Sequence, residues 1–299
     1  METASFPVLG ASGTLPLGQE EDDVLQVGVL GDKLGGDLLA ADQGLRPVGP
    51  LLDPRDGGGV QFLELLGVQL HDGVSANGLL AWNEAAQSDP SLNCALTADI
   101  NMTGKEWTPV GMSINYSGTF DGQGHSITGL AITTNSTGGE NAVLFGSVGS
   151  NGTVKNLQLK DVNCDVQQNG VAGGIANSNY GTITACSVTG EIKANNGAAG
   201  GIAVINFGTI TACWFDGNLT TSYDNGGIAA YNYSTITTCF YGGNAGHGAY
   251  NQGGTIDATK VEGTTTWQTA VGGMNAALTG NDYQWKLGAN SLPVLQKNQ

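Results

Sequence analysis

One short phrase recurs three times in the second half of the chain. Residues 181–186 read Gly-Thr-Ile-Thr-Ala-Cys, residues 208–213 repeat this phrase letter for letter, and residues 234–239 are a degraded copy, at steps of 27 and 26 residues. A Gly-Gly-Ile-Ala phrase beginning at residues 173, 200 and 226 keeps the same steps. Repetition with a period of this length is typical of a solenoid, in which each unit buries its apolar face against its neighbours.

The letters within one unit predict strands. Apolar or β-branched residues alternate with polar ones over four to six positions and then stop at Gly, Asn or Asp, whereas no helical period persists between residues 117 and 255. About 27 residues hold three short strands at roughly 3.3 Å per residue. We therefore expect an all-β fold, namely a right-handed parallel β-helix (a pectate-lyase-like solenoid) of about five coils with a short helical cap at each end.

Aligning the units predicts apolar ladders through the interior. The earlier stretch 152–159 fits the same frame, and an apolar residue then returns at each inward level. The first ladder consists of Val154, Ile183, Ile210 and Ile236. The second consists of Leu157, Cys186, Cys213 and Cys239. A third places Leu159 over Val188, Phe215 and Tyr241.

Composition and charge restrict the classes of binding partner that we expect. The chain has 299 residues, 40% of them hydrophobic, and 26 acidic residues against 10 Lys and Arg give a net charge of -16. Nucleic acids and anionic membranes are recognised by basic patches, so we expect neither as a partner. No apolar run approaches the length of a membrane span, so no membrane insertion is expected.

The five cysteines permit two interpretations. Stacked coils bring equivalent positions near the Cα separation of a disulfide. Alternatively, the thiols form a buried stack of small hydrophobic side chains, which we favour because cysteine alternates with leucine in the ladder and an odd count leaves one thiol unpaired. No cysteine or histidine spacing indicates a metal site, and no cofactor is expected.

Four segments are expected along the chain. Residues 1–74 are rich in Leu, Gly and acidic side chains, hold no regular period and predict a poorly ordered or unrelated segment without a visible signal peptide. Residues 75–117 predict an N-terminal cap of one helix and one strand, and residues 118–258 the β-helix repeats. Residues 259–299 predict a C-terminal cap. Caps are expected because the open strand edges of a solenoid otherwise aggregate.

Several phrases resemble a known family. Residues 96–102 (Leu-Thr-Ala-Asp-Ile-Asn-Met), 107–111 (Trp-Thr-Pro-Val-Gly) and 118–130, which contain Thr-Phe-Asp-Gly-Gln-Gly-His, resemble the opening of bacterial GLUG-motif β-helix proteins. Residues 142–146 and the Gly-Gly-Ile-Ala phrases resemble the motif itself, although Val143 stands where glycine is usual. The resemblance covers about residues 76–299. It implies a secreted or surface-displayed, adhesin-like repeat protein, of a kind whose relatives also occur beside IgA-cleaving peptidases, and no shared catalytic signature.

An enzyme is the rival hypothesis, because parallel β-helices include polysaccharide lyases and hydrolases. Such chemistry needs paired carboxylates or a basic residue, yet the acidic residues of the repeats are scattered singly and no arginine follows Arg55. The cluster Asp121-Gly122-Gln123-Gly124-His125 could be an acid-base pair or a cation site. Its alternating Asp and Gly favour a tight turn. We therefore predict no catalytic residues and no metal site.

Aromatic residues are the remaining lead for binding. Tyr180, Phe207 and Tyr233 recur at one position of the repeat, and Trp214 lies nearby in sequence. An exposed row would be a binding strip for carbohydrate or protein, whereas a buried row would be a further core ladder. The periodicity does not decide between the two, because the row falls at a bend.

These observations together favour a non-catalytic, extracellular or cell-surface module of a bacterium that serves in adhesion or ligand display. The expected partners are glycans or host extracellular proteins. The alternative is a carbohydrate-active β-helix enzyme or its accessory domain. The ligand, the oligomeric state and the route of export do not follow from the sequence.

Overall fold

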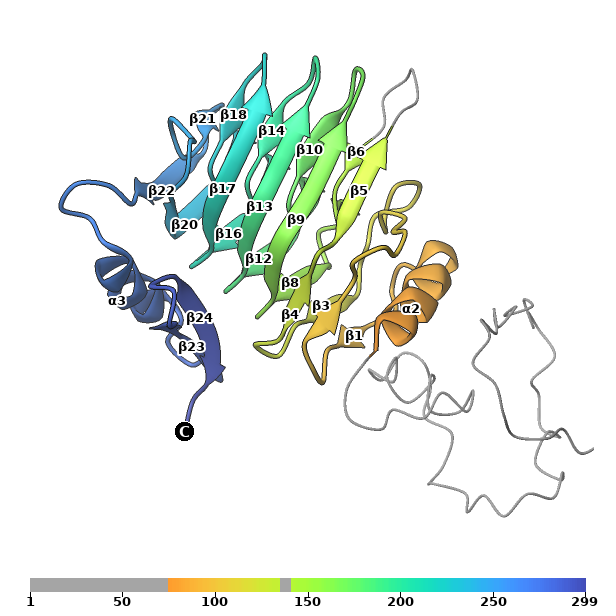
Figure 1. Ribbon diagram of the computed structural model, residues 1–299, viewed down its shortest axis with the longest axis horizontal. Coiled ribbons are helices and arrows are strands. Elements are labelled where there is room, and N and C mark those ends of the chain that lie inside the picture. Colours follow the sequence, from red (N-terminus) through yellow and green to blue (C-terminus); the bar gives the residue numbers. More distant parts are fainter. Residues whose placement is uncertain (1–74, 135–140) are drawn as a thin grey trace, which may run out of the picture. The chain divides into compact units, whose positions relative to one another are not determined.

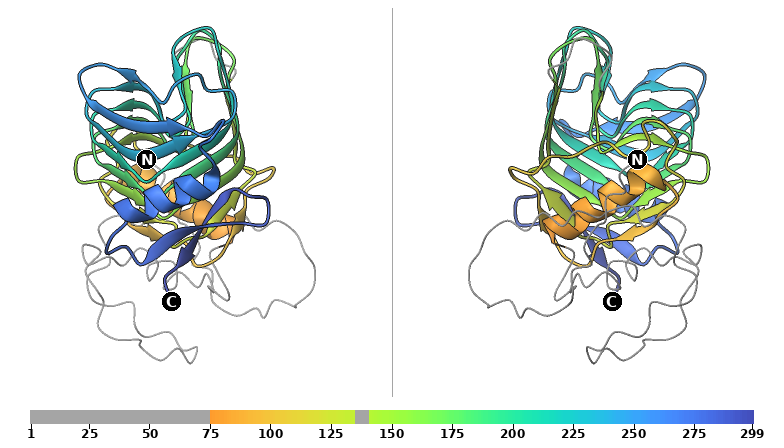
Figure 2. Two further views of the ribbon diagram at one scale, coloured as in Figure 1. Left: turned by 90° about the vertical axis from the view of Figure 1, so that its left-hand side faces the viewer. Right: turned by 90° about the vertical axis from the view of Figure 1, so that its right-hand side faces the viewer.

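The computed structural model describes residues 75–134 and 141–299, all of them in one compact unit of the chain. These residues form a parallel β-helix of about five turns (Figure 1). In the view down the stack, successive coils superpose (Figure 2). The expectation for residues 1–74 lies outside the described residues.

Each coil contributes strands to three faces. The first, which we call the threonine face, contains β1 (Cys94–Ala95), β3 (Thr119–Asp121), β8 (Thr153–Lys155), β12 (Thr182–Thr184), β16 (Thr209–Thr211), the first half of β20 (Thr235–Tyr241) and β22 (Thr255–Lys260). The second, the charged face, contains β2 (Ile100–Asn101), β4 (Ser126–Thr128), β5 (Ala131–Thr134), β9 (Gln158–Val166), β13 (Ser187–Ala194) and β17 (Trp214–Thr221). Strand β20 continues from the first face into the second.

The third face consists of two narrow sheets. One is built from β7 (Phe145–Val148), β11 (Ala176–Asn179), β15 (Ala203–Asn206), β19 (Ala229–Asn232) and β21 (Tyr250–Asn251). The other contains β6 (Asn141–Ala142), β10 (Val171–Gly173), β14 (Ala199–Gly200) and β18 (Asn225–Gly226). All pairings within the three faces are parallel.

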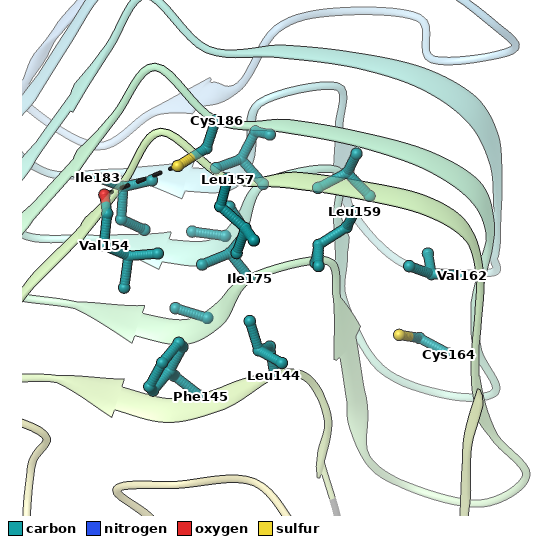
Figure 3. Packing of buried hydrophobic residues seen from close by; sticks show 14 of the residues in the cluster. Leu144, Phe145, Val154, Leu157, Leu159, Val162, Cys164, Ile175, Ile183 and Cys186 are labelled. Atoms are coloured by element: carbon teal, nitrogen blue, oxygen red, sulfur yellow. Dashed lines mark hydrogen bonds between the residues drawn. The ribbon is translucent and has the colours of Figure 1, made fainter. Parts of the chain in front are cut away.

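The registers bring equivalent residues of successive coils side by side. Ile183 pairs with Val154 on one side and with Ile210 on the other, and Ile210 pairs with Ile236. All four side chains are fully buried. Leu157 and the three repeat cysteines are also fully buried, and Figure 3 shows Val154, Ile183, Leu157 and Cys186 directed into the interior.

Glycine is required where two faces approach each other inside the coil. A Cβ on Gly201 would lie 2.0 Å from the Gly227 carbonyl oxygen and 2.5 Å from the Phe215 ring. Gly174 faces Val188 in the same way, and Gly227 faces Tyr241. The Gly-Gly-Ile-Ala phrase therefore recurs because the large side chains of the third ladder fill the space that a second side chain would need.

The threonine face turns into the charged face through a left-handed residue in each coil. Asn156, Ala185, Ala212 and Thr238 occupy this position with φ between 48° and 54°. Only Asn is favoured there among these residue types, so Ala and Thr adopt this conformation at an energetic cost. Stacking on the next coil offsets that cost, since the Ala185 and Ala212 amides donate to Thr211 and Thr237 carbonyls of the following coil.

Helix α2 (Ala76–Ser88) covers the first coil. The Ser75 hydroxyl caps it by accepting from the Gly78 amide. Its buried Trp82 packs against Phe120 and Phe145, with ring centroids 5.1 and 6.4 Å away. The helix thereby covers apolar side chains at the start of the stack.

The C-terminal segment lies along the flank of the stack. Helix α3 (Trp267–Ala277) and the antiparallel hairpin of β23 (Tyr283–Leu287) and β24 (Pro293–Lys297) form a second apolar cluster with Ala185, Ala212 and Phe240. The buried Trp285 donates its indole N–H to the Ala212 carbonyl at 3.0 Å, and the Leu295 amide donates to Gln158 Oε1 at 3.3 Å. This clasp, residues 267–297, thus contacts several coils from outside.

Candidate functional site

Three aromatic rings form a continuous row on the outside of the coils, which we call the aromatic row. Tyr180 and Phe207 have ring centroids 4.9 Å apart at an interplanar angle of 8°, and Phe207 and Tyr233 are also 4.9 Å apart, at 19°. The residues are 44%, 38% and 46% exposed, respectively. Of the two alternatives left open by the sequence, the structure therefore shows the exposed row.

A buried asparagine ladder sets the direction of these rings. Asn179, Asn206 and Asn232 immediately precede the three aromatic residues and are fully buried. Asn179 Nδ2 donates to Asn206 Oδ1 at 2.8 Å, and Asn206 Nδ2 donates to Asn232 Oδ1 at 2.8 Å. The asparagine side chain points inward at the end of each strand, and the aromatic side chain that follows it at the bend lies on the outside.

The stacking determines which part of each ring a ligand can reach. The faces of Phe207 are occupied by Tyr180 and Tyr233, so the row presents ring edges over most of its length. The edge of an aromatic ring carries partial positive charge and the face partial negative charge. The edges therefore suit contact with electronegative oxygen atoms, whereas a sugar ring could stack only on the outer faces at the two ends of the row.

A row of threonines runs beside the aromatic row. Thr182 follows Tyr180 by two positions, and the strand registers align six threonines across the threonine face. This threonine row contains Thr119, Thr153, Thr182, Thr209, Thr235 and Thr255. A second row adds Thr184, Thr211 and Thr237 in the three central coils.

The hydroxyls of these rows are available to a ligand. Among residues 75–134 and 141–299, none of the threonine hydroxyls in the two rows and neither hydroxyl of Tyr180 and Tyr233 takes part in an intramolecular hydrogen bond. Stacked β-branched side chains have restricted χ1 rotamers, so the hydroxyls form a regular array with a spacing of about 4.8 Å between coils. Sequence reasoning singled out the rings but not these threonines, although the Thr-Ile-Thr phrase was the available signal.

Trp214 does not belong to this site. It is 3% exposed and lies at the start of the charged face, where its ring is 5.1 Å from Trp267 and 6.0 Å from Trp285. The expectation that Trp214 contributes to binding is therefore wrong. The clasp, which carries no repeat, covers the tryptophan, and the repeat pattern alone could not reveal this.

The Asp121–His125 phrase forms a turn in which the two titratable groups have separate partners. Asp121 Oδ1 accepts from the Gln123 amide at 2.9 Å, and its other carboxylate oxygen lies 3.3 Å from Lys155 Nζ. His125 Nδ1 instead lies 3.6 Å from Asp99. Gln123 and Gly124 both have positive φ, as a tight turn requires.

The thiols are buried rather than reactive. All five cysteines are free and buried. The Cys186 thiol donates to the Thr184 carbonyl at 3.2 Å, and the Cys213 thiol repeats this contact with Thr211. Burial raises the pKa of the Cys164 thiol to about 12 and also raises the pKa of Cys213 and Cys239 well above the ordinary value. A thiol that stays protonated is a poor nucleophile and a poor metal ligand.

Residues 75–134 and 141–299 contain no group of three or more His, Cys, Asp or Glu side chains arranged to hold a metal ion. Within the same part of the chain, neither helix has the length and apolar character needed to cross a membrane.

Comparison with known proteins yields partial matches. No family model matches the chain. A protein of Evansella cellulosilytica, provisionally named a Gly-rich membrane protein, is 38% identical over 95 residues, and halomucin of Haloquadratum walsbyi is 32% identical over 80 residues. These matches cover 31% and 27% of this chain but only 11% and 1% of the two relatives.

One solved structure is also similar. It is a crystal structure from Bacteroides ovatus, described as a candidate immunoglobulin A1 protease, with 16% sequence identity and a TM-score of 0.42. The match covers 70% of this chain and 86% of that chain. By its own parallel registers and inward ladders, this chain is a parallel β-helix of about five turns.

Proposed function

We propose that this chain is a non-catalytic binding module of an extracellular or cell-surface repeat protein, and that the aromatic row contacts its ligand. The observation that carries the proposal is the exposure of Tyr180, Phe207 and Tyr233 as a stacked, outward row. A clustered set of exposed large rings is uncommon on a soluble surface and is typical of interaction sites. Membership of the GLUG-motif proteins, which we infer from the phrases quoted above, is consistent with a surface location.

The partnered carboxylates favour binding over catalysis. Asp121 is paired with Lys155, and Asp165 lies 3.5 Å from Lys193. Each of these carboxylates is thus engaged in an ion pair with a lysine and does not face a second carboxylate across a groove, as glycoside hydrolysis requires. The aromatic row itself offers ring edges and two phenol groups, which can bind but supply no acid-base pair.

The proposal is tested by binding of the full chain to immobilised glycans and extracellular matrix proteins. We expect a Phe207→Ser variant to lose binding by about tenfold or more, because central aromatic side chains dominate interface energetics. The matched control is Tyr223→Ser, since Tyr223 is 60% exposed, lies outside the row and donates no side-chain hydrogen bond to any described residue. Equal losses in the two variants, or none in either, would contradict the proposal.

A second measurement addresses catalysis. Each bound polysaccharide is incubated with the full chain, and reducing ends and unsaturated uronates are measured over time. We expect neither product to accumulate above the level without protein. Product release that is lost in Asp121→Asn would contradict the non-catalytic part of the proposal and favour a carbohydrate-active enzyme.

A further inference from the structure

The charged residues of the central coils are confined to one side of the molecule. The chain has no Asp, Glu, Lys, Arg or His between Asp165 and Glu191, between Lys193 and Asp216, or between Asp224 and His247. Those three stretches contain β10, β11 and β12, then β14, β15 and β16, then β18, β19 and β20. The charges therefore lie on the charged face and its loops, and the acidic residues that look scattered in the sequence are segregated in the fold.

In the three central coils, the threonine face and the third face carry no charged side chains, and they meet at the aromatic row. The inward asparagine ladder ends the third face, and the threonine face begins three positions later with Thr182, Thr209 and Thr235. We call this surface of three coils the uncharged corner and define it by Tyr180, Phe207, Tyr233, Thr182, Thr209 and Thr235. It carries no formal charge, although the whole chain has a net charge of -16.

From this segregation we propose that the uncharged corner binds a neutral polysaccharide that runs along the axis of the stack. The inference rests on the proposed binding function and names its ligand class. A charged ligand would lose hydration at this surface without meeting an opposite charge. A polyanion would in addition be repelled by the acidic chain.

The chemistry of the corner matches a neutral, hydroxyl-rich polymer. Its threonine and tyrosine hydroxyls have no partner within the described residues and can each donate and accept a hydrogen bond. The exposed edges of the aromatic row suit sugar oxygens. Because the same triplet of aromatic, Thr and Thr returns in each central coil about 4.8 Å further along, a repeating polymer can make equivalent contacts in succession. Successive weak contacts on one polymer add to a high overall affinity.

The experiment measures retardation of the full chain in native gels that contain soluble polysaccharide. Neutral probes are a mixed-linkage β-glucan, a mannan and a dextran, and anionic probes are pectate and alginate at the same ionic strength. We expect at least one neutral polymer to retard the protein and neither anionic polymer to do so. The triple variant Thr182→Val, Thr209→Val and Thr235→Val should weaken the dissociation constant about tenfold or more, because it removes three hydroxyls without changing side-chain shape.

The control is Thr220→Val, which removes an exposed threonine hydroxyl from the charged face. Circular dichroism establishes that each variant is folded. Retardation by pectate or alginate equal to that by neutral polymers would overturn the ligand class, and so would a triple variant that binds like the control. Binding to a protein ligand alone, lost in Phe207→Ser, would overturn the polysaccharide but leave the proposed function standing. Absence of all binding would overturn both.

Discussion

The Asn179 side chain donates through Nδ2 to Asn206 Oδ1 at 2.8 Å in the fully buried interior. Asn206 Nδ2 in turn donates to Asn232 Oδ1, and Asn232 Nδ2 donates to the Ser234 and Thr255 carbonyls. The ladder stops at the other end because Val148 occupies the paired position on β7, and Asn179 Oδ1 has no partner there. The central amide is therefore the one that both neighbours depend on.

Replacing that central amide should destabilise the fold. In Asn206→Ala, Asn232 Oδ1 would stay buried without a partner, and Asn179 Nδ2 would keep only its contact with the Thr209 carbonyl. We expect this to lower the free energy of unfolding by about 1–3 kcal/mol. Urea denaturation followed by circular dichroism measures this change. The control is Asn218→Ala at an exposed position of β17, where we expect less than about 0.5 kcal/mol. Similar losses at both positions would contradict the role of the ladder.

The glycine phrase predicts a contrast between two Gly→Ala substitutions. Gly201→Ala places a methyl group 2.0 Å from the Gly227 carbonyl oxygen, so we expect a loss of several kcal/mol or failure to fold. In Gly272→Ala, inside α3, the new Cβ has nothing within 4 Å. Alanine should stabilise this helical position by about 0.5–1 kcal/mol. Melting temperatures that shift in the same direction in both variants would count against the packing described.

Thiol burial predicts a dependence of stability on pH. The Cys164 thiol has a pKa raised from 9.0 to about 12 in the folded protein by burial. Between these values the unfolded chain releases the proton and the folded chain retains it, so stability falls as pH rises, by up to about 1.4 kcal/mol per pH unit for each such thiol. The urea midpoint should therefore decrease from about pH 8.5 to about pH 10.5, because the thiols of the unfolded chain lose their protons over this range.

Two companion measurements identify the source of that dependence. Cys164→Val should reduce the slope of the urea midpoint against pH, because valine does not titrate. Ellman's reagent should label none of the five thiols in the native protein and all five in urea, since every cysteine is free and buried. Rapid labelling of the native protein would show that the interior is open to solvent.

The clasp predicts a large effect from a residue outside the repeats. Trp285 is fully buried and hydrogen-bonded to Ala212, so Trp285→Ala should lower stability by about 3–5 kcal/mol. Leu287→Ala, on the same strand but 38% exposed, should lower it by less than about 1 kcal/mol. An unchanged urea midpoint in Trp285→Ala would mean that the clasp contributes nothing to the stability of the coils.

The repeat letters were sufficient to predict the fold and its registers. Identical residues that recur at a constant interval occupy equivalent positions in successive coils. For this reason the sequence alone was sufficient to align Ile183, Ile210 and Ile236. The direction of Tyr180 could not be predicted, because it falls where strand alternation is interrupted by a bend. The buried asparagine before it was visible in the sequence, but only the ladder of side-chain amides shows that Asn179 points inward.

Other features depend on contacts between residues that are far apart in the sequence, which the repeat pattern does not predict. Trp214 is buried by Trp267 and Trp285, which are 53 and 71 residues further along the chain. Ala185 and Ala212 adopt left-handed conformations that alanine avoids in isolation, so residue propensity would place them elsewhere. The three uncharged stretches can be read from the sequence, but the uncharged corner forms only when the fold places these stretches on neighbouring coils.

The clasp changes how the stack would respond to a mechanical load. A bare solenoid pulled at one end can peel away strand by strand, and each step breaks only the bonds to the neighbouring coil. Tension applied to β24 would instead first act on Leu295 and Trp285, which are held by Gln158 and Ala212 in two different coils that precede β22 in the stack. Several coils would then share the force at once, so resistance to stretching would be set by the hairpin and not by the last strand.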